Sequence, residues 1–204
     1  VGLLIGVVTQ FPDNKLHIVF CDVGQGDGIY IKTPQNYDIL IDGGPSGRML
    51  LECLSTHMPF WDREIDMVVM THPQADHLNG LIDVVERYSV KYFAASPVGH
   101  TTEGFARLKS LIEEKGIPIR NVYKGDSIVF GTVQFDTLWP SREWLEAVVR
   151  EQGIASSESL SNPQILNTEY TSNPLSASQI LDTNILGAFT TKEDLNDFSI
   201  YLHL

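Results

Sequence analysis

The chain has 204 residues, 43% hydrophobic and 20% charged, and this composition suits one globular domain with a sizeable core. The formal net charge is −12 at pH 7, which argues against a basic groove for an extended nucleic-acid backbone, although bound cations can reverse the local field. The two cysteines, Cys21 and Cys53, lie far apart without a CxxC pair. We therefore expect two buried free thiols rather than a disulfide or a zinc knuckle.

Strands and helices follow from the spacing of the apolar residues. Strands are expected over 15–23, 26–33, 37–44, 65–72 and 90–97, with three short strands within 117–140 and a last one within 196–204. Helices are expected over 47–58, 78–88, 102–116 and 142–152. Turn residues QNYD predict a hairpin between the second and third strands. The mixture predicts a layered α/β or α+β fold.

The two ends of the chain and one internal stretch depart from this pattern. The opening VGLLIGVVT is shorter than the about 20 residues that span a bilayer, so residues 1–14 are either the remnant of a membrane or signal segment or an ordinary buried strand. Residues 15–204 then form one domain. Residues 153–194, rich in Ser, Asn and Pro, are expected to be a mobile loop or insertion. The run FSIYLHL stops inside a β pattern, and we expect further chain beyond Leu204.

The stretch THPQADHLNG, residues 71–80, concentrates groups that bind metal ions. His72 follows an apolar strand, and Asp76 and His77 open the next helix. A loop between a strand and a helix turns its side chains into one cup, and imidazole and carboxylate together suit Zn²⁺, Mn²⁺ or Fe²⁺. The spacing alone is also compatible with a surface loop that carries two unrelated histidines.

The order of three motifs carries more information than any one of them. DVGQGD at 22–27 and ILIDGG at 39–44 precede THPQADHLNGL, and IDVVERYSVKYF follows it. This order resembles the metallo-β-lactamase superfamily and, more narrowly, the hydrolase domain of the ComEC competence-channel family. The later run LNDFSIYLHL resembles a segment of the same family, so the resemblance extends over about 15–140 and 195–204.

The resemblance implies a four-layer αββα sandwich with two divalent metal ions, Zn²⁺ or Mn²⁺, at one edge. By position in the family's HxHxDH pattern, His72, Asp76 and His77 are expected metal ligands, and Asp76 and His77 are also the expected catalytic residues. Gln74 occupies the place of a ligand histidine, so one metal position is expected to be weak. Two further ligands, in a GD and an HHGS-like motif, are expected beyond Leu204.

Other residues are expected around the metal ions rather than on them. Asp42, in IDGG, is expected to orient His72 or His77 through a hydrogen bond, with an ordinary turn aspartate as the alternative. Asp22 and Asp27 flank the GQG loop, which is either a place of close approach to substrate or a structural loop. Asn196 and Ser199 match the family's later segment and are expected to line the site.

Three functions remain open. The first is a metal-dependent hydrolase that uses a metal-bound hydroxide as a nuclease or phosphodiesterase on DNA or RNA. The second is a β-lactamase or another ester, lactone or thioester hydrolase of the same fold, with a small-molecule substrate. The third is a metal-poor, non-catalytic binding module of a DNA-uptake system, which Gln74 supports because it stands in the place of a ligand histidine. The apolar start suggests a membrane tether and a membrane-associated or extracytoplasmic location.

Overall fold

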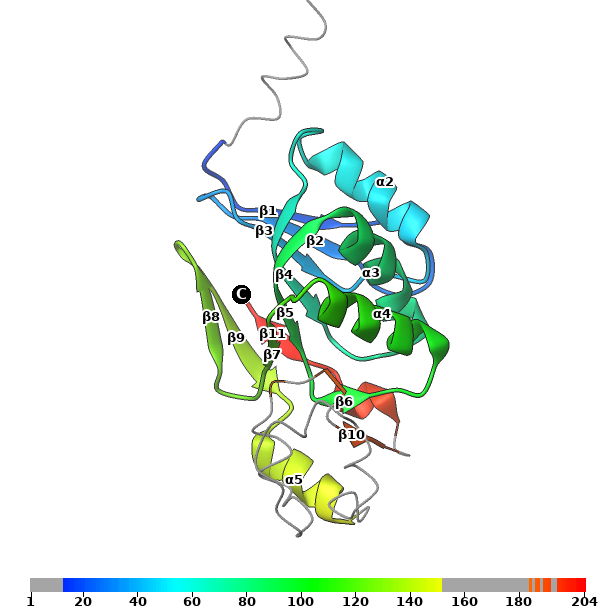
Figure 1. The fold of residues 1–204 in the computed structure, drawn as a ribbon. Helices are drawn as coiled ribbons and strands as arrows, with labels where there is room; N and C mark the ends of the chain where they lie inside the picture. The colour runs from blue at the N-terminus through cyan, green and yellow to red at the C-terminus, as the bar shows by residue number, and fades with distance from the viewer. Residues whose placement is uncertain (1–12, 152–183, 185, 188, 192–193) are drawn as a thin grey trace, which may run out of the picture.

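The computed structural model describes residues 13–151, 184, 186, 187, 189–191 and 194–204 (Figure 1). The strands are β1 His17–Phe20, β2 Ile29–Lys32, β3 Asp38–Ile41, β4 Glu64–Met70, β5 Ser89–Ala95, β6 Val98–Gly99, β7 Ile119–Asn121, β8 Ser127–Phe130, β9 Val133–Trp139, β10 Phe189–Thr190 and β11 Tyr201–His203. The helices are α2 Gly47–His57, α3 Ala75–Arg87, α4 Glu103–Glu114, α5 Arg142–Glu151 and a 3₁₀ turn, η3, at Leu195–Phe198.

A six-stranded sheet in the order β1-β2-β3-β4-β5-β7 forms the centre of the fold. The predicted hairpin is confirmed, because β2 and β3 pair antiparallel with Ile31 opposite Ile39. From β3 to β7 the strands run parallel, so their carboxyl ends meet at one edge of the sheet. In parallel sheets this edge is where ligands usually bind.

Helices α2, α3 and α4 cover one face of this sheet (Figure 1). Their apolar residues recur at helical spacing and reach the strands' side chains, as Leu54, Leu81 and Leu108 show by being fully buried. Each such leucine contributes about 1.5–3 kcal/mol by leaving water. The predicted helices are confirmed, except that α3 begins at Ala75 rather than at residue 78.

The opposite face of the sheet packs against a second sheet, in the order β11-β9-β8. Strand β9 alternates, with Val133 and Phe135 buried against Ile39 and Met67 of the first sheet. The α, β and β layers of the predicted sandwich therefore lie within the described residues. Of the three short strands expected within 117–140, β7 joins the first sheet, whereas β8 and β9 form the second.

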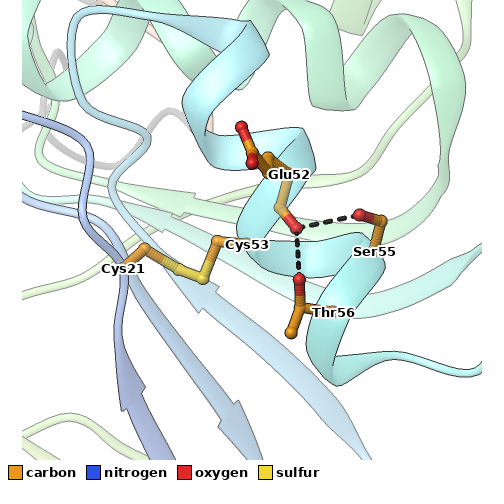
Figure 2. Close-up of a disulfide and its surroundings, with 5 residues drawn as sticks. All are labelled: Cys21, Glu52, Cys53, Ser55 and Thr56. Carbon is orange, nitrogen blue, oxygen red and sulfur yellow. Dashed lines mark hydrogen bonds between the residues drawn. A yellow bond between two sulfur atoms is a disulfide. The ribbon is translucent and has the colours of Figure 1, made fainter.

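The expectation of two free thiols was wrong, because Cys21 and Cys53 form a disulfide (Figure 2). It ties the segment after β1 to helix α2, across 32 residues of sequence. The absence of a short cysteine spacing misled the prediction: β2 and β3 form a hairpin that returns the chain, so distant residues meet. The covalent link fixes the start of the loop Asp22–Asp27.

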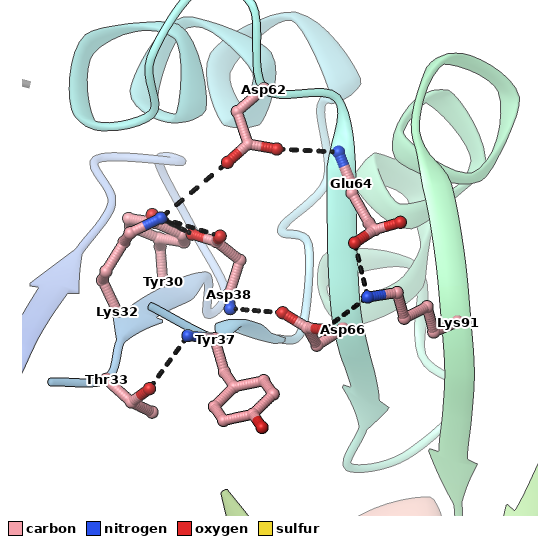
Figure 3. A network of polar contacts seen from close by, with 9 residues as sticks. All are labelled: Tyr30, Lys32, Thr33, Tyr37, Asp38, Asp62, Glu64, Asp66 and Lys91. Carbon is pink, nitrogen blue, oxygen red and sulfur yellow. Dashed lines mark hydrogen bonds and ion pairs between the residues drawn. The ribbon is translucent and has the colours of Figure 1, made fainter. Parts of the chain in front are cut away.

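A network of polar side chains joins the strands at the end of the sheet where β3 and β4 begin (Figure 3). The buried Asp38 carboxylate accepts hydrogen bonds from Tyr30 and Lys32, and the Asp38 amide donates to Asp66 at 2.8 Å. Burial raises the pKa of Asp38, although Lys32 and Tyr30 oppose this shift. Lys91 continues the network from Asp66 to β5. Because every buried carboxylate here has a donor, we interpret the network as structural.

Some predictions fall on residues that the structure does not describe. Residues 1–12, with the possible membrane remnant, and most of the stretch 153–194 lie outside the described residues. Within that stretch Phe189–Thr190 form β10, which pairs parallel with β6, a strand that the sequence pattern did not predict. Among the described residues, none of the helices has the length and apolar character that a bilayer span requires.

Candidate metal centre

The centre lies at the carboxyl ends of the two parallel strands β3 and β4. Strand β3 ends at Ile41, which pairs with Val69 near the end of β4, so Asp42 and the pair Thr71–His72 leave the sheet side by side. The chain then turns into α3, whose first turn carries Asp76. Strands β3 and β4 and helix α3 thus deliver polar side chains to one place.

Direct contact between two backbones holds α3 on the IDGG turn. The Gly43 amide donates to the His77 carbonyl at 2.7 Å, and the Gly80 amide donates to the Gly44 carbonyl at 3.0 Å. A Cβ at Gly80 would lie 1.8 Å from the Gly43 oxygen, so only glycine allows this approach. The distance between Asp42 and His77 is therefore set by the main chain.

Asp42 is the centre of the hydrogen bonds at the site. It is buried and adopts φ 56°, in the left-handed region that aspartate tolerates better than most residues. Its Oδ1 accepts from the Thr71 amide at 2.8 Å, and its Oδ2 accepts from the Thr71 hydroxyl at 2.6 Å. The same Oδ2 lies 2.8 Å from Nδ1 of His77. The structure thus places Asp42 directly on His77 and, through Thr71, next to His72.

The rings of His72 and His77 are in contact at the centre, with centroids 3.9 Å apart and planes tilted by 48°. Both are buried. Nδ1 of His72 is in hydrogen-bond contact with Thr71 and Ser199, whereas its Nε2 has no partner. Because Asp42 holds Nδ1 of His77, the second nitrogen of that ring, Nε2, faces the Asp76 carboxylate at 4.0 Å. Two ligands on one tetrahedral ion are separated by roughly 3.4 Å, so Asp76 and His77 lie close to coordinating distance.

The two imidazoles have opposite pKa shifts. Burial lowers the pKa of His72 below 6.5, and the neighbouring His77 adds to the effect. Burial also acts to lower the pKa of His77, but the hydrogen bond and negative charge of Asp42 outweigh it, so that pKa is raised. Neutral His72 is the form that binds a metal ion.

The GQG loop packs against the first turn of α3. A Cβ at Gly26, which has φ 107°, would lie 2.0 Å from the Asp76 carbonyl oxygen. The Gly44 amide donates to the Asp27 carbonyl at 2.7 Å and anchors the end of the loop. Gly26 therefore allows the loop to approach the protein's own helix α3 closely.

Asp27, Asp42 and His77 together offer ligand atoms within 4.8 Å of one another, and they could hold a cation. The His77 nitrogen that lies near both carboxylates is Nδ1, at 3.8 Å from Asp27 and 2.8 Å from Asp42. A cation there would displace the hydrogen bond from His77 to Asp42. Nε2 of His77, the Asp76 carboxylate and Nε2 of His72 offer a different nitrogen and oxygen donor set, of the kind that suits Zn²⁺ or Mn²⁺, but among the described residues these three do not form a group whose ligand atoms all lie within 4.8 Å of one another.

Of the other residues that were expected around the metal ions, some lie beside His72 and others lie away from it. Gln74 directly precedes α3, and its side chain partly opposes the lowering of the His72 pKa by burial, while Nε2 of His72 has no hydrogen-bond partner. Ser199 reaches Nδ1 of His72 at 2.9 Å. Asn196 instead bonds Asp194 within the 3₁₀ turn, and Asp22 is exposed and outside the group of nearby carboxylates.

The sequence pattern predicted no role for Thr71 and two alternative roles for Asp27. Thr71 is polar, and it stands between the mainly apolar run IDMVVM and His72. That position, at a strand end beside a candidate ligand, is the signal that could have identified it. The hydroxyl contact to Asp42 depends on the pairing of β3 with β4, which the sequence does not specify.

Residues 37–150 match the family model of the beta-lactamase superfamily domain. This match includes more than half of the chain, and the protein therefore belongs to the beta-lactamase superfamily. The predicted fold class, a layered α/β sandwich of the metallo-β-lactamase type, is confirmed.

Solved structures of metallo-β-lactamases are similar to the chain over a limited part. Rm3 metallo-beta-lactamase is 20% identical, with 54% of this chain and 44% of that chain covered and a TM-score of 0.39. MEM-A1, a subclass B3 enzyme from a soil metagenome library, is 17% identical, with 61% and 48% covered and a TM-score of 0.41. The enzyme from Pontibacter korlensis is 20% identical, with 61% and 55% covered and a TM-score of 0.37. The chain thus spans about half the length of these structures.

Proposed function

We propose that this chain is a metal-dependent hydrolase whose divalent cations bind at His72, Asp76 and His77. The observation that carries the proposal is Nε2 of His72, which is buried beside His77 and has no hydrogen-bond partner. Leaving a buried polar atom unpaired costs about 1–3 kcal/mol, and a cation would remove that cost. Membership of the beta-lactamase superfamily supports the same chemistry.

The residues of the proposed site have different roles. A divalent cation bound there would lower the pKa of a bound water to about 7 and offset negative charge that develops on the substrate. Asp76 and His77 are the proposed catalytic residues, and Asp42 holds Nδ1 of His77 so that Nε2 faces Asp76. Gln74 would make the position next to His72 the weaker of two, because an amide is a poor ligand for Zn²⁺.

A nucleic acid is the substrate that we propose, with hydrolysis of a phosphodiester bond. The ordered motifs DVGQGD, ILIDGG and THPQADHLNG, which resemble the ComEC branch, support this choice. The amino end of α3 at the site also favours an anionic group. A net charge of −12 favours the alternative, a small ester, lactone or β-lactam, because a polyanion is repelled.

The test combines metal content with two substrate assays on the same purified protein. We expect bound Zn²⁺ or Mn²⁺, cleavage of labelled DNA or RNA, and no hydrolysis of the β-lactam nitrocefin. Nitrocefin turnover without nuclease activity would favour the small-molecule alternative. Protein that binds neither ion and cleaves neither substrate would be the metal-poor binding module, and the proposal would fail.

A double variant identifies the catalytic residues. Asp76→Ala with His77→Ala is expected to abolish hydrolysis, while the thermal transition persists. The matched control is Asp13→Ala with His17→Ala, an exposed aspartate–histidine pair joined by a hydrogen bond of 2.8 Å. The control changes the same two residue types and should keep full activity. Activity that survives in the first variant would contradict these roles.

We also propose an extracytoplasmic or membrane-associated location. The disulfide between Cys21 and Cys53 supports this, because disulfides persist mainly in oxidising compartments. Detection of the oxidised form in an extracytoplasmic fraction of cells would agree with the proposal. A fully reduced protein in the cytoplasm would contradict it.

A further inference from the structure

Two hydroxyl groups meet the same nitrogen of His72. The Thr71 hydroxyl lies 3.0 Å from Nδ1, and the Ser199 hydroxyl lies 2.9 Å from it. The first comes from the metal-binding loop itself, and the second comes from a segment 127 residues away. Neither residue has a role in the proposed chemistry so far.

The direction of these hydrogen bonds follows from Asp42. A carboxylate oxygen only accepts, so the Thr71 hydroxyl, at 2.6 Å from Oδ2 of Asp42, must donate its one hydrogen there. The Thr71 oxygen therefore presents a lone pair to Nδ1 of His72. If Nδ1 also carried a lone pair, the two atoms would repel each other, whereas an N–H at Nδ1 would donate a hydrogen bond to the Thr71 oxygen.

We infer that Thr71 and Ser199 are positioning residues that hold neutral His72 in the tautomer with its proton on Nδ1. Nε2 then carries the lone pair, and this is the buried nitrogen that has no partner. Thr71 transmits the charge of Asp42 to His72, while Asp42 acts on His77 directly. One carboxylate therefore sets the tautomer of both imidazoles, and both Nε2 atoms are prepared to bind a cation.

This inference deepens the proposed metal centre and rests on it, but its test does not need activity. The tautomer of His72 is measured by long-range ¹H–¹⁵N NMR of the metal-free protein at about pH 8, where histidine is mostly neutral. We expect the proton on Nδ1 in the unchanged protein. We expect Thr71→Val with Ser199→Ala to shift the population toward a proton on Nε2, because Nδ1–H would lose both acceptors.

Metal affinity provides the second measurement. Zn²⁺ binding by the double variant should weaken about 10- to 100-fold, as for other residues that orient metal ligands. Thr71→Ser keeps the hydroxyl and should restore both the tautomer and the affinity. The matched control is Thr56→Val with Ser55→Ala, because these hydroxyls bond only the Glu52 carbonyl on the exposed side of α2 (Figure 2).

The outcomes separate the inference from the proposed function. A proton on Nε2 of His72 in the unchanged protein, or a tautomer that the double variant leaves unaltered, would overturn the inference. If the double variant does not fold, the single variants Thr71→Val and Ser199→Ala are compared in the same way. An Nδ1–H tautomer in a protein that binds no Zn²⁺ would keep the inference about the ring and reject the metal centre.

Discussion

Replacing Gly80 by alanine sets two physical effects against each other. Helix propensity favours the change by about 1 kcal/mol, since Gly80 lies inside α3. The new Cβ, however, would lie 1.8 Å from the Gly43 oxygen and 2.7 Å from the Gly43 carbonyl carbon. Both are backbone atoms that cannot rotate away, so the helix itself must move.

The cost of that movement exceeds the gain in propensity. Moving α3 away weakens the hydrogen bonds from Gly43 to His77 and from Gly80 to Gly44, each of which contributes about 1 kcal/mol. Overpacking adds about 1–3 kcal/mol. We therefore expect Gly80→Ala to destabilise the protein by about 2–4 kcal/mol. At about 2–4 °C per kcal/mol for a chain of this size, the thermal midpoint should fall by roughly 5–15 °C.

Urea unfolding of the oxidised protein measures the change, and Zn²⁺ titration shows whether the ligands have moved. The control is Gly104→Ala in α4, where the new Cβ would meet the end of the Asn79 side chain at 2.8 Å, a group that can turn aside. This variant should be as stable as the parent or slightly more stable. If Gly80→Ala were as stable as Gly104→Ala, the two backbones would not be in contact and our account of the site would be wrong.

Three further predictions concern other parts of the structure. Gln74→His should raise the affinity for Zn²⁺, since imidazole is the better ligand, and equal metal content in both proteins would mean that position 74 does not face the ion. Cys21→Ser with Cys53→Ser should lower the free energy of unfolding by about 3.7 kcal/mol for a loop of this length, as urea unfolding with and without reductant can measure. Burial lowers the pKa of His72, so the unfolded chain binds a proton at this histidine at a higher pH than the folded protein does, and the free energy of unfolding falls as the pH falls through 6.5. His72→Gln should make the free energy of unfolding of the metal-free protein depend less steeply on pH in this range. An unchanged pH dependence would contradict the prediction.

Much of the fold could be predicted because the apolar spacing is regular. The β2–β3 hairpin and helices α2 to α4 follow local patterns, and the structure confirms them. The disulfide could not be predicted in this way, since it depends on how the hairpin returns the chain to α2. Strand β6 has only two residues, too few for any periodicity to show.

The same distinction applies to the candidate site, where contacts within one short motif could be predicted from the sequence and contacts between distant segments could not. His72, Asp76 and His77 fall within one short motif, and the structure places His72 in ring contact with His77 and Asp76 4.0 Å from Nε2 of His77, so that the local motif accounts for these two contacts. Thr71 was overlooked because its contact depends on Asp42, which directly follows the neighbouring strand β3 and lies 29 residues earlier in the sequence. Asn196 and Ser199 are close in sequence, but the 3₁₀ turn directs them differently, and only the three-dimensional structure separates them.

The segment that carries Ser199 is attached to the metal loop at two successive residues. Ser199 contacts His72, and the Ile200 amide donates to the Thr71 carbonyl at 3.0 Å. Strand β11 and a cation at the proposed centre would consequently be linked by mass action: a ligand of Nε2 of His72 that binds only while Ser199 is docked would favour the docked segment, and local opening of β11 would weaken its binding by the same free energy. Metal affinity would then report how firmly the segment Ser199–Ile200 is docked.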